Sequence, residues 1–448
     1  MNMPLMINSF DPAHAEDLSP VVEKLLERRT RVLGPSYKLF YERPVHVVRS
    51  EGVWLYDEEG EPYLDVYNNV PSVGHCHPAV VEAVTRQMGV LNTHTRYLYD
   101  IVLTYAEKLL ATFPSELSNV MFTCTGSESS DLAVRVAKRY TRAQGIVVTA
   151  NGYHGITAAI AEMSPSLGNG VPLGNHVRTV AAPDAYRAGG RDVGECFGQA
   201  VEAAIADLAR HGIRPAALVT DTIFSSDGVF SDPPGFLQRG VEAMRAAGGL
   251  FIADEVQPGF ARTGDAMWGF QRHGVVPDLV TMGKPMGNGL PIGGVVARPH
   301  LLAEFARDAR YFNTFGGNPV CCAAANAVLD VIQQEGLMAQ AARVGAFLQK
   351  GLCELAADYP QIGDVRGAGL FIGAEFVKDP VTREPHADLA LHVVNRLRDR
   401  KVLISASSPF GNVLKIRPPL PFTEANAAYF LEILADVMAD ARRLGHAL

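Results

Sequence analysis

Two acidic residues and a lysine directly follow apolar runs, where an α/β protein commonly binds its ligands. Asp254 and Glu255 fall in the run GLFIADEV (249–256), and ligands of open α/β sheets gather at the carboxyl ends of strands. Lys284 follows DLVTMG (278–283) in a glycine-rich stretch. A lysine shielded from water has a lowered pKa and can attack a carbonyl group. These residue types predict carbonyl chemistry. The alternatives are a structural ion pair at Asp254 and an exposed loop at Lys284.

A third feature offers a site for an anion. The run NVMFTCT (119–125) leads into Gly126 and Ser127 and then into a helical pattern. The start of a helix presents free backbone N–H groups and the positive end of the helix dipole, which together suit a phosphate. The alternative is an ordinary helix start at which Ser127 is the N-cap residue.

Two well-known nucleotide motifs are excluded by their spacing. GAGLFIG (367–373) has a GxGxxxG pattern inside an expected strand, whereas a dinucleotide site needs a strand, then the glycines, then a helix. Lys284 lacks the earlier glycine of a P-loop, and Pro285 stands where a P-loop has serine or threonine. Gly126 and Ser127 therefore remain the candidate phosphate site.

The elements that must position these residues alternate along the middle of the chain. Six short apolar runs predict strands, at 119–125, 145–150, 216–222, 249–256, 278–283 and 293–298. The helical patterns between them cover Ser127–Arg142, Cys196–His211 and Gly235–Ala247. Runs that are apolar on both faces predict an α/β fold with a largely parallel sheet between helices. A hairpin (41–67) precedes this region, and long helices with two strands after Pro319 predict a smaller α+β unit.

The composition is that of a globular protein. The 448 residues are 48% hydrophobic and 20% charged, so the chain has enough apolar surface to bury a core. Forty basic against 48 acidic residues leave a net charge of −8, which argues against nucleic-acid binding. Six cysteines without CxxC spacing, no signal-like N-terminus and no apolar run of about 18 residues predict a soluble, cytoplasmic protein without a membrane segment. No metal site is predicted.

The order of these motifs resembles that of the class III aminotransferases, which are pyridoxal 5′-phosphate enzymes of fold type I. The matching segments follow the family's order: GVWLYDEEGEPYLDVYNNVPSVGHCHP, TCTGSES, YHG, IADEVQPGFARTG, PDLVTMGKPMGNGLPIGGV, TFGGNP and VRGAGLFIGAEF. The resemblance implies a mainly parallel central sheet flanked by helices, plus a smaller α+β domain. It also implies an N-terminal arm and hairpin (1–66) that joins the small domain, a large cofactor-binding domain (67–330) and a C-terminal small domain (331–448).

The resemblance implies a role for each motif residue. Lys284 would bind the cofactor as an aldimine and move the proton at the substrate Cα, while Asp254 would pair with the pyridinium nitrogen. Gly126 and Ser127 would bind the cofactor phosphate. The other implied contacts are Tyr153 stacked on the ring, Val256 on its other face, Gln257 near the 3′-oxygen and Thr314 from the neighbouring subunit of a homodimer. His154 is expected to make either a structural hydrogen bond or a cofactor contact.

Arg417, in VLKIRPPL, matches the arginine with which many family members bind a substrate carboxylate, and its planar fork suits bidentate binding. The alternative is a structural ion pair. The segment AALVTDTIFSSDGVF departs from the family, because Asp221 stands where a glutamate is expected and Phe224 replaces a glutamine. Ser226 takes the position of the gating glutamate that pairs with the arginine. The partner of Arg417 is therefore open among Asp221, Ser226 and Asp227.

The N-terminal half is most similar to a subgroup that includes alanine–glyoxylate-like aminotransferases and phosphoethanolamine phospho-lyases. The sequence predicts a transaminase that exchanges an amino group between an amine or amino acid and a keto acid by a ping-pong mechanism. A phospho-lyase acting on an amino-phosphate is the alternative, since both reactions begin with loss of the Cα proton to Lys284. A third alternative is a cofactor-binding protein without turnover, and the presence of both Asp254 and Lys284 argues against it.

Overall fold

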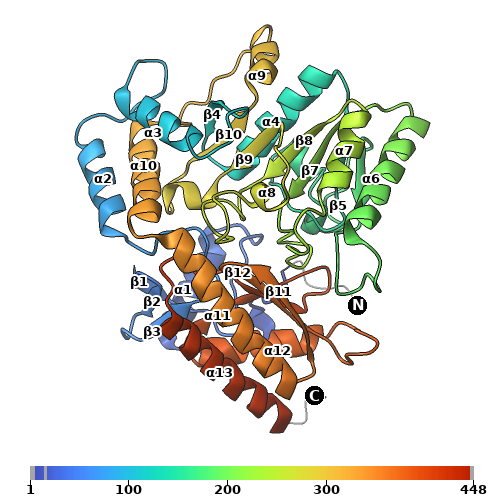
Figure 1. Ribbon diagram of the computed structural model, residues 1–448. Helices are drawn as coiled ribbons and strands as arrows, with labels where there is room; N and C mark the ends of the chain where they lie inside the picture. Colours follow the sequence, from blue (N-terminus) through green and yellow to red (C-terminus); the bar gives the residue numbers. More distant parts are fainter. Residues whose placement is uncertain (1–5, 15–17, 444–448) are drawn as a thin grey trace.

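A seven-stranded sheet forms the centre of the computed structural model, which describes residues 6–14 and 18–443 (Figure 1). In spatial order the strands are β4 (Asn119–Thr123), β10 (Gly293–Ala297), β9 (Leu279–Met282), β8 (Leu250–Asp254), β7 (Pro215–Asp221), β5 (Gly145–Thr149) and β6 (Val177–Val180). Strand β10 runs antiparallel to β4 and β9, and the neighbouring pairs from β9 to β6 are parallel. The sheet is therefore mainly parallel, which confirms the predicted fold class.

Helices cover both faces of this sheet, because successive side chains of each strand point to opposite faces. In β7, Leu218 belongs to one core cluster, whereas Ala217 and Val219 belong to another. The helices that contribute to these clusters are α6 (Val193–Arg210) and α7 (Gln238–Ala246) for the first, and α4 (Gly126–Thr141) and α9 (Pro299–Ala306) for the second. Burial on both faces explains why these strands are continuous apolar runs in the sequence.

The helices predicted between the strands are present, with one difference at α7. Helices α4 and α6 begin and end within three residues of the expected bounds. Helix α7 begins at Gln238 and not at Gly235, because Gly235 has φ +93°, a left-handed conformation that an α-helix cannot contain. The shorter helices of this region are α5 (Ala158–Ala161), the 3-10 turn η2 (Pro165–Leu167) and α8 (Gly269–Arg272).

The C-terminal part of the chain forms a second, antiparallel sheet. Its strands in spatial order are β11 (Ile362–Ala368), β12 (Phe371–Phe376), β15 (Val413–Ile416) and β14 (Ser405–Ser407). Helices α11 (Leu337–Asp358) and α12 (Ala387–Asp399) pack against this sheet, and α13 (Glu424–Arg443) packs against both helices. This arrangement confirms the smaller α+β unit.

Strand pairing joins the N-terminal hairpin to the C-terminal part of the chain. The strands β1 (Val47–Glu51), β2 (Trp54–Asp57) and β3 (Pro62–Asp65) form an antiparallel meander, and β3 pairs in parallel with β13 (Val402–Leu403). The meander is preceded by an exposed helix, α1 (Pro20–Val32), and by the short turn η1 (Pro12–His14). The domain boundaries at residues 66 and 330 stay a prediction.

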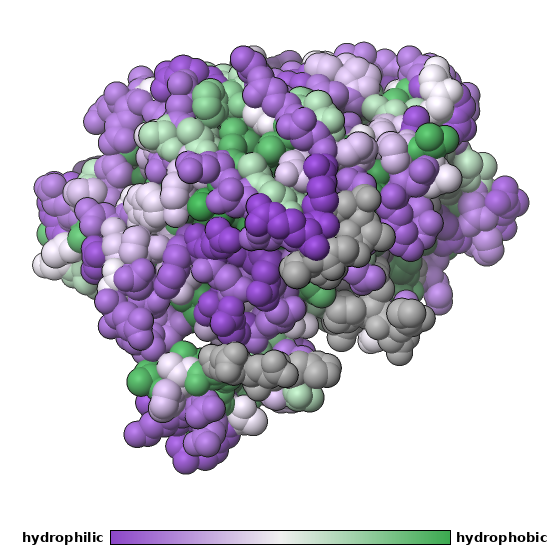
Figure 2. Space-filling view, turned by 90° about the horizontal axis from the view of Figure 1, so that it is seen from below, coloured by the Kyte–Doolittle hydropathy of each residue, from purple (hydrophilic) through white to green (hydrophobic). Residues whose placement is uncertain are grey.

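A helical layer lies beside the edge of the large sheet at β4. Helix α10 (Pro319–Gln334) packs against α2 (Pro78–Met88) and α3 (Asp100–Leu110). The face of the molecule in Figure 2 is largely hydrophilic, with scattered hydrophobic side chains. Within the described ranges, no helix is both long enough and apolar enough to cross a lipid bilayer.

Candidate active site

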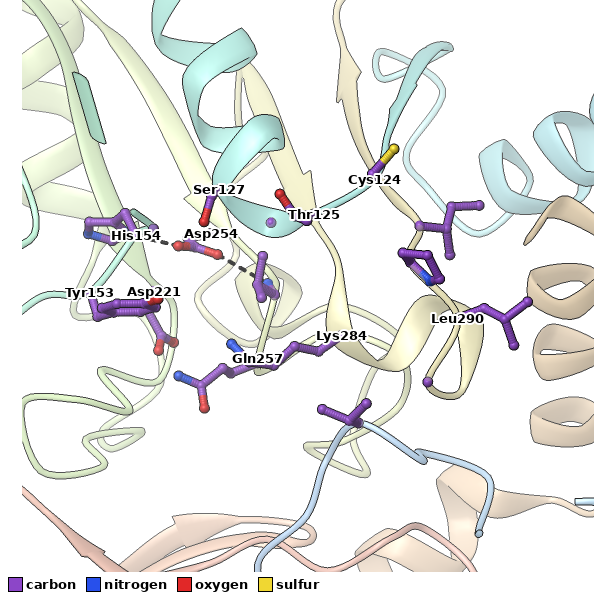
Figure 3. Close-up of a pocket in the computed structure, with 17 residues that line it drawn as sticks. Cys124, Thr125, Ser127, Tyr153, His154, Asp221, Asp254, Gln257, Lys284 and Leu290 are labelled. Carbon is purple, nitrogen blue, oxygen red and sulfur yellow. Dashed lines mark hydrogen bonds and ion pairs between the residues drawn. The ribbon is translucent and has the colours of Figure 1, made fainter. Parts of the chain in front are cut away.

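A cavity of about 270 Å³ lies at the carboxyl ends of β7 and β8, where the first turn of α4 meets the sheet (Figure 3). The predicted residues that line it are Gly126, Ser127, Tyr153, Asp254, Val256, Gln257 and Lys284. Arg417 lies behind the cavity wall, where it donates a hydrogen bond to the lining residue Gln257. Thr314 does not line the cavity. The fold therefore brings most of the predicted site together, from segments far apart in the sequence.

The first turn of α4 forms one wall of the cavity. Thr125 is the N-cap residue, since its Oγ1 accepts a hydrogen bond from the Glu128 N–H at 3.1 Å. The alternative in which Ser127 caps the helix is therefore wrong. Ser127 Oγ instead accepts a hydrogen bond from the Ile156 N–H at 3.1 Å. The N–H groups of Gly126 and Ser127 have no partner within the helix, so this wall can bind an anion.

Two glycines allow this wall to pack closely. A Cβ on Gly155, which has φ +138°, would lie 2.7 Å from Ser127 Cα. A Cβ on Gly126 would lie 2.9 Å from Cγ2 of Val256. A larger residue at either position would push the helix start away from the segments that carry Tyr153 and Val256. The glycines of the motifs TCTGSES and YHG thus serve close contact between backbones.

Asp254 is held by two hydrogen bonds at the end of β8. The residue is 4% exposed, and Oδ2 lies 2.7 Å from Nδ1 of His154 (Figure 3). Oδ1 accepts a hydrogen bond from the Val256 N–H at 3.1 Å. Of the two expectations for His154, the structure shows the hydrogen bond, and its acceptor is the carboxylate of Asp254. Both oxygens of Asp254 are oriented by these contacts, which positions the carboxylate at the cavity.

The neighbouring carboxylate, Glu255, accepts hydrogen bonds that hold the start of α8. Its oxygens accept hydrogen bonds from the Thr222 hydroxyl at 2.8 Å and from the N–H groups of Gly269 and Phe270 at 2.7 and 2.8 Å. The last two contacts provide acceptors for backbone N–H groups in the first turn of α8, which have no partner within the helix. Burial raises the pKa of Glu255 to about 7. The two adjacent acidic residues therefore point to different places, with Asp254 at the cavity.

Lys284 is half-buried and lines the cavity. It follows β9, opens the 3-10 turn η3 (Lys284–Gly287) and has φ +24°, a strained value of the kind found at functional sites. Its Nζ lies 6.0 Å from the centre of the Tyr153 ring. Burial, followed by the positive charge of Arg417, lowers the pKa of Lys284 to about 8. The lysine therefore does not sit in an exposed loop, and its amine is suited to carbonyl chemistry near neutral pH.

Gln257 links the cavity to Arg417. Its Nε2 donates to Ser225 Oγ at 2.5 Å, and its Oε1 accepts a hydrogen bond from Nη1 of Arg417. The same Nη1 donates to Oδ1 of Asn69 at 2.9 Å, and the Arg417 guanidinium lies 4.4 Å from the centre of the Tyr67 ring. The contacts of the Arg417 side chain that the structure shows are thus amide oxygens and aromatic rings, and not the carboxylate of a structural ion pair.

The three candidate partners of Arg417 are engaged elsewhere. Asp221 accepts hydrogen bonds from the N–H groups of Ile223 and Ser225, both at 3.0 Å. Asp227 accepts from the Thr149 hydroxyl at 2.7 Å and from the Asn151 N–H at 3.0 Å. The backbone oxygen of Ser226 accepts from Asn151 Nδ2 at 2.7 Å. The structure shows no contact of these three residues with Arg417, and the cavity residue that contacts Arg417 is Gln257.

Two charged residues of this region have no cofactor- or substrate-binding role in the sequence prediction, although Asp221 is named there as a possible partner of Arg417. Asp221 lines the cavity and is the ladder neighbour of Asp254 in the pairing of β7 with β8. Burial, together with the negative charge of Asp254, raises the pKa of Asp221. Lys415 is 6% exposed and stands two residues before Arg417. That spacing is the available sequence signal, since alternate residues of a strand share one face.

Thr314 lies outside the cavity, on the exposed connection between α9 and α10. The large neighbouring side chains Phe312 and Phe315 are 41% and 70% exposed. Asn313 joins this connection to α4 through a hydrogen bond from its Nδ2 to Glu128 at 3.2 Å. The expectation that Thr314 reaches the cofactor of a neighbouring subunit stays a prediction.

The cavity fits pyridoxal phosphate, the cofactor that the resemblance implies. The start of α4 suits its phosphate, the oriented carboxylate of Asp254 suits a protonated ring nitrogen, and the amine of Lys284 suits its aldehyde. In the part of the chain that the structure describes, no group of three or more His, Cys, Asp or Glu side chains is arranged to bind a metal ion. The donor set therefore matches an organic phosphate with a carbonyl group.

Proteins of known family are similar to this chain over nearly its whole length. The family model described as aminotransferase class-III matches residues 40–438. The chain is 39% identical to alanine–glyoxylate aminotransferase 2-like of Drosophila melanogaster, over 98% of this chain and 92% of that protein. It is 36% identical to ethanolamine-phosphate phospho-lyase homolog 1 of Caenorhabditis elegans, over 93% of each chain.

A solved structure of similar sequence has the same fold. A phospholyase from Arthrobacter in complex with phosphoethanolamine is 44% identical to this chain and has a TM-score of 0.90. The match covers 93% of this chain and 99% of the other. Relatives named as aminotransferases and relatives named as phospho-lyases thus share this fold over nearly the whole chain.

Proposed function

Because this chain belongs to the class III aminotransferase family of pyridoxal-phosphate-dependent enzymes, we propose that it moves an amino group between an amino compound with an anionic end and a keto acid. The observation that supports this proposal is the joint position of Lys284 and Asp254 at one cavity. The lysine is on one wall, the carboxylate is at the end of β8, and Arg417 lies beside the cavity. The reaction would run as two half-reactions that use the same site in turn.

The residues of the chain divide the work of the first half-reaction. The bound cofactor supplies a ring that withdraws electrons from the substrate Cα. Asp254, oriented by His154 and the Val256 N–H, would hold the proton on the ring nitrogen. Lys284, with its pKa lowered to about 8, would take the Cα proton as a general base. Arg417 would bind the anionic end of the substrate and so orient its amino group toward Lys284.

A phospho-lyase is the second candidate function. Two observations favour it, namely the 44% identity to the Arthrobacter phospholyase and the lack of a carboxylate among the observed contacts of Arg417. An amino-phosphate would also lose its Cα proton to Lys284. The C–O bond to the phosphate on the next carbon would then break, and water would release the product. The overall balance is amino-phosphate and water giving an aldehyde, ammonia and phosphate.

We also propose that the active enzyme is a homodimer in which Thr314 contacts the cofactor of the other subunit. The exposed rings of Phe312 and Phe315 beside Thr314 support this proposal, since large apolar side chains at a surface commonly mark an interface. Sedimentation of the purified holoenzyme measures the assembly directly. A monomer with full activity would contradict the proposal.

A donor screen separates the two functions. The purified holoenzyme is given amino donors with and without a phosphate on the carbon next to the amine, in the presence or absence of pyruvate or 2-oxoglutarate. Amination of a keto acid supports the transaminase, and phosphate release that needs no keto acid supports the phospho-lyase. If no donor reacts in either assay, both functions are wrong.

A further inference from the structure

Two buried basic side chains lie close together at the end of β15. Lys415 and Arg417 are two residues apart, and each is 6% exposed. Lys415 Nζ lies 5.7 Å from the centre of the Phe371 ring, and the guanidinium carbon of Arg417 lies 5.9 Å from the centre of the same ring. Lysine and arginine are almost never buried without a partner, so the pair requires an explanation.

The protein supplies neutral groups, and no carboxylate at ion-pair distance, to this pair within the described ranges. Arg417 donates to the amide oxygens of Asn69 and Gln257, and Lys415 faces the ring of Phe371. The nearby carboxylates of Asp221 and Asp227 already accept hydrogen bonds from other groups. The two basic side chains therefore have no ion-pair partner among the described residues, although the charges of Asp221 and Asp227 partly offset the lowering of the pKa of Lys415.

Two buried hydrogen-bond donors at Arg417 and Asn69 have no acceptor. Nε of Arg417 and Nδ2 of Asn69 are buried and have no acceptor. Burial, followed by the charge of Arg417, holds the pKa of Lys415 well below its usual range, so an incoming anion would favour its charged form. A ligand that satisfies these groups must offer several acceptor oxygens and more than one negative charge. A phosphoryl dianion meets both conditions, whereas a carboxylate offers one charge and two oxygens.

The pair lies between the cofactor cavity and a second, open cavity. Gln257 lines the first cavity and contacts Arg417, and Tyr67 stacks on Arg417 and lines the second. The second cavity has a volume of about 990 Å³, and the polar residues of its lining include Asn8, Tyr67, Asn151, Ser226, Ser405 and Ser407. Ser405 is the ladder partner of Lys415 in the pairing of β14 with β15. Residues that line each of the two cavities are therefore direct neighbours of the pair.

We propose that Lys415 and Arg417, together with Asn69, bind the phosphoryl dianion of an amino-phosphate substrate. This inference rests on the proposed function, because the amino group of the same substrate must react beside Lys284. It holds for both outcomes of the reaction, since an amino-phosphate can donate its amino group or lose its phosphate. Lys415 is then a specificity residue, and the dianion is the feature that it selects.

The test compares substrates that differ in the charge of their anionic end. The holoenzyme is assayed with 2-aminoethyl phosphate and with 3-aminopropanoate, and the ratio of their kcat/KM values is measured. Lys415→Met removes the charge at similar length and should lower this ratio by about 10-fold or more, which is the effect of losing one charge-assisted hydrogen bond. Lys415→Arg should restore most of the ratio. Lys350→Met, which removes an exposed lysine on α11, should leave the ratio unchanged.

A binding measurement with ligands that cannot react tests phosphoryl binding separately from turnover. Ethyl phosphate and propanoate lack an amine, so calorimetric titration of the holoenzyme with each reports the subsite alone. Lys415→Met should weaken ethyl phosphate by about 10-fold or more and weaken propanoate much less. Equal weakening of both ligands, or no weakening of ethyl phosphate in a variant with wild-type thermal unfolding, overturns the inference. An enzyme that binds ethyl phosphate through Lys415 and yet turns over no amine overturns the proposed function alone.

Discussion

At the cofactor end of the site the Asp254 carboxylate is paired at both oxygens, although Nε2 of His154 is buried without a partner, whereas at the Arg417 end two buried donors have no acceptor. Both oxygens of Asp254 accept hydrogen bonds, from His154 and from the Val256 N–H. Arg417 Nε and Asn69 Nδ2, by contrast, are buried without a partner. We call the part of the site around Arg417, Asn69 and Lys415 the recognition end. Groups that take part in every turnover are preorganised by the protein, while the recognition end leaves hydrogen-bond donors for the substrate to satisfy.

The charges of the two ends differ in the same way. Asp221 and Asp254 bring negative charge to the cofactor cavity and partly balance Lys284. Lys415 and Arg417 face amide groups and an aromatic ring. An anion is thus the component missing from the recognition end, and this difference makes the two ends separable by mutation.

The largest effect is expected at the cofactor end. Lys284→Ala removes the amine that takes the Cα proton, and we expect kcat to fall on the order of 10⁴-fold. Single-turnover kinetics with the best donor of the screen measure this loss. The matched control is Lys350→Ala on the surface, which should keep wild-type rates. A Lys284→Ala enzyme within tenfold of the wild type would falsify the assignment of the general base.

A smaller loss is expected when the preorganised carboxylate is neutralised. Asp254→Asn keeps the shape of the side chain and removes its charge, so kcat should fall on the order of 10²- to 10³-fold with cofactor still bound. Cofactor content is measured by absorbance and activity by donor turnover. Unchanged kinetics in an enzyme with full cofactor content would show that the charge of Asp254 has no part in the reaction.

The recognition end can be given the carboxylate that it lacks. Gln257→Glu places a negative charge at the atom that accepts from Arg417 Nη1, and this charge competes with the anionic end of the substrate. We expect KM for an anionic donor to rise about 10-fold, with a smaller change in kcat. Steady-state kinetics with an anionic donor test this. A lower KM in the variant would mean that Arg417 does not bind the anionic end.

The smallest effect concerns stability of the apoenzyme. The pKa of Lys284 is lowered from its ordinary value of 10.5 to about 8, so between these values the unfolded chain binds more protons than the native protein. The free energy of unfolding should therefore rise with pH across that window, relative to Lys284→Met, by about 1 to 2 kcal/mol. Denaturant unfolding of both proteins at pH 7.5, 9 and 10.5 measures this difference. Parallel pH profiles would show that the amine of Lys284 is as well solvated in the native state as in the unfolded chain.

Much of the cofactor end follows from local sequence. Asp254 is placed by the end of an apolar strand, Lys284 by the turn after the next strand, and Gly126 by the start of a helix. Strand ends and helix starts depend on neighbouring residues, so they are visible in a linear pattern. The N-cap is harder to assign, because Thr125 and Ser127 can both cap a helix and the backbone conformation of Thr125 decides between them.

The recognition end does not follow from local sequence in the same way. Gln257 and Arg417 are 160 residues apart in the chain, and Asn69 is 348 residues from Arg417. Their contacts arise where the segment after β3, the segment after β8 and the end of β15 meet. No periodicity in one of these segments predicts a hydrogen bond to another, so the gating partner stays open at the level of sequence.

The sequence by itself determined the mainly parallel sheet, the second α+β unit and the residue types at the cofactor cavity, because apolar patterning and strand ends are local properties. Tertiary structure decided which polar atoms are paired. It joined His154 to Asp254, gave Arg417 the amide oxygens of Gln257 and Asn69, and buried Lys415 without a carboxylate beside it. The physical reason is that hydrogen bonds and desolvation depend on distances across the whole fold, and these distances exist only once the three sheets have come together.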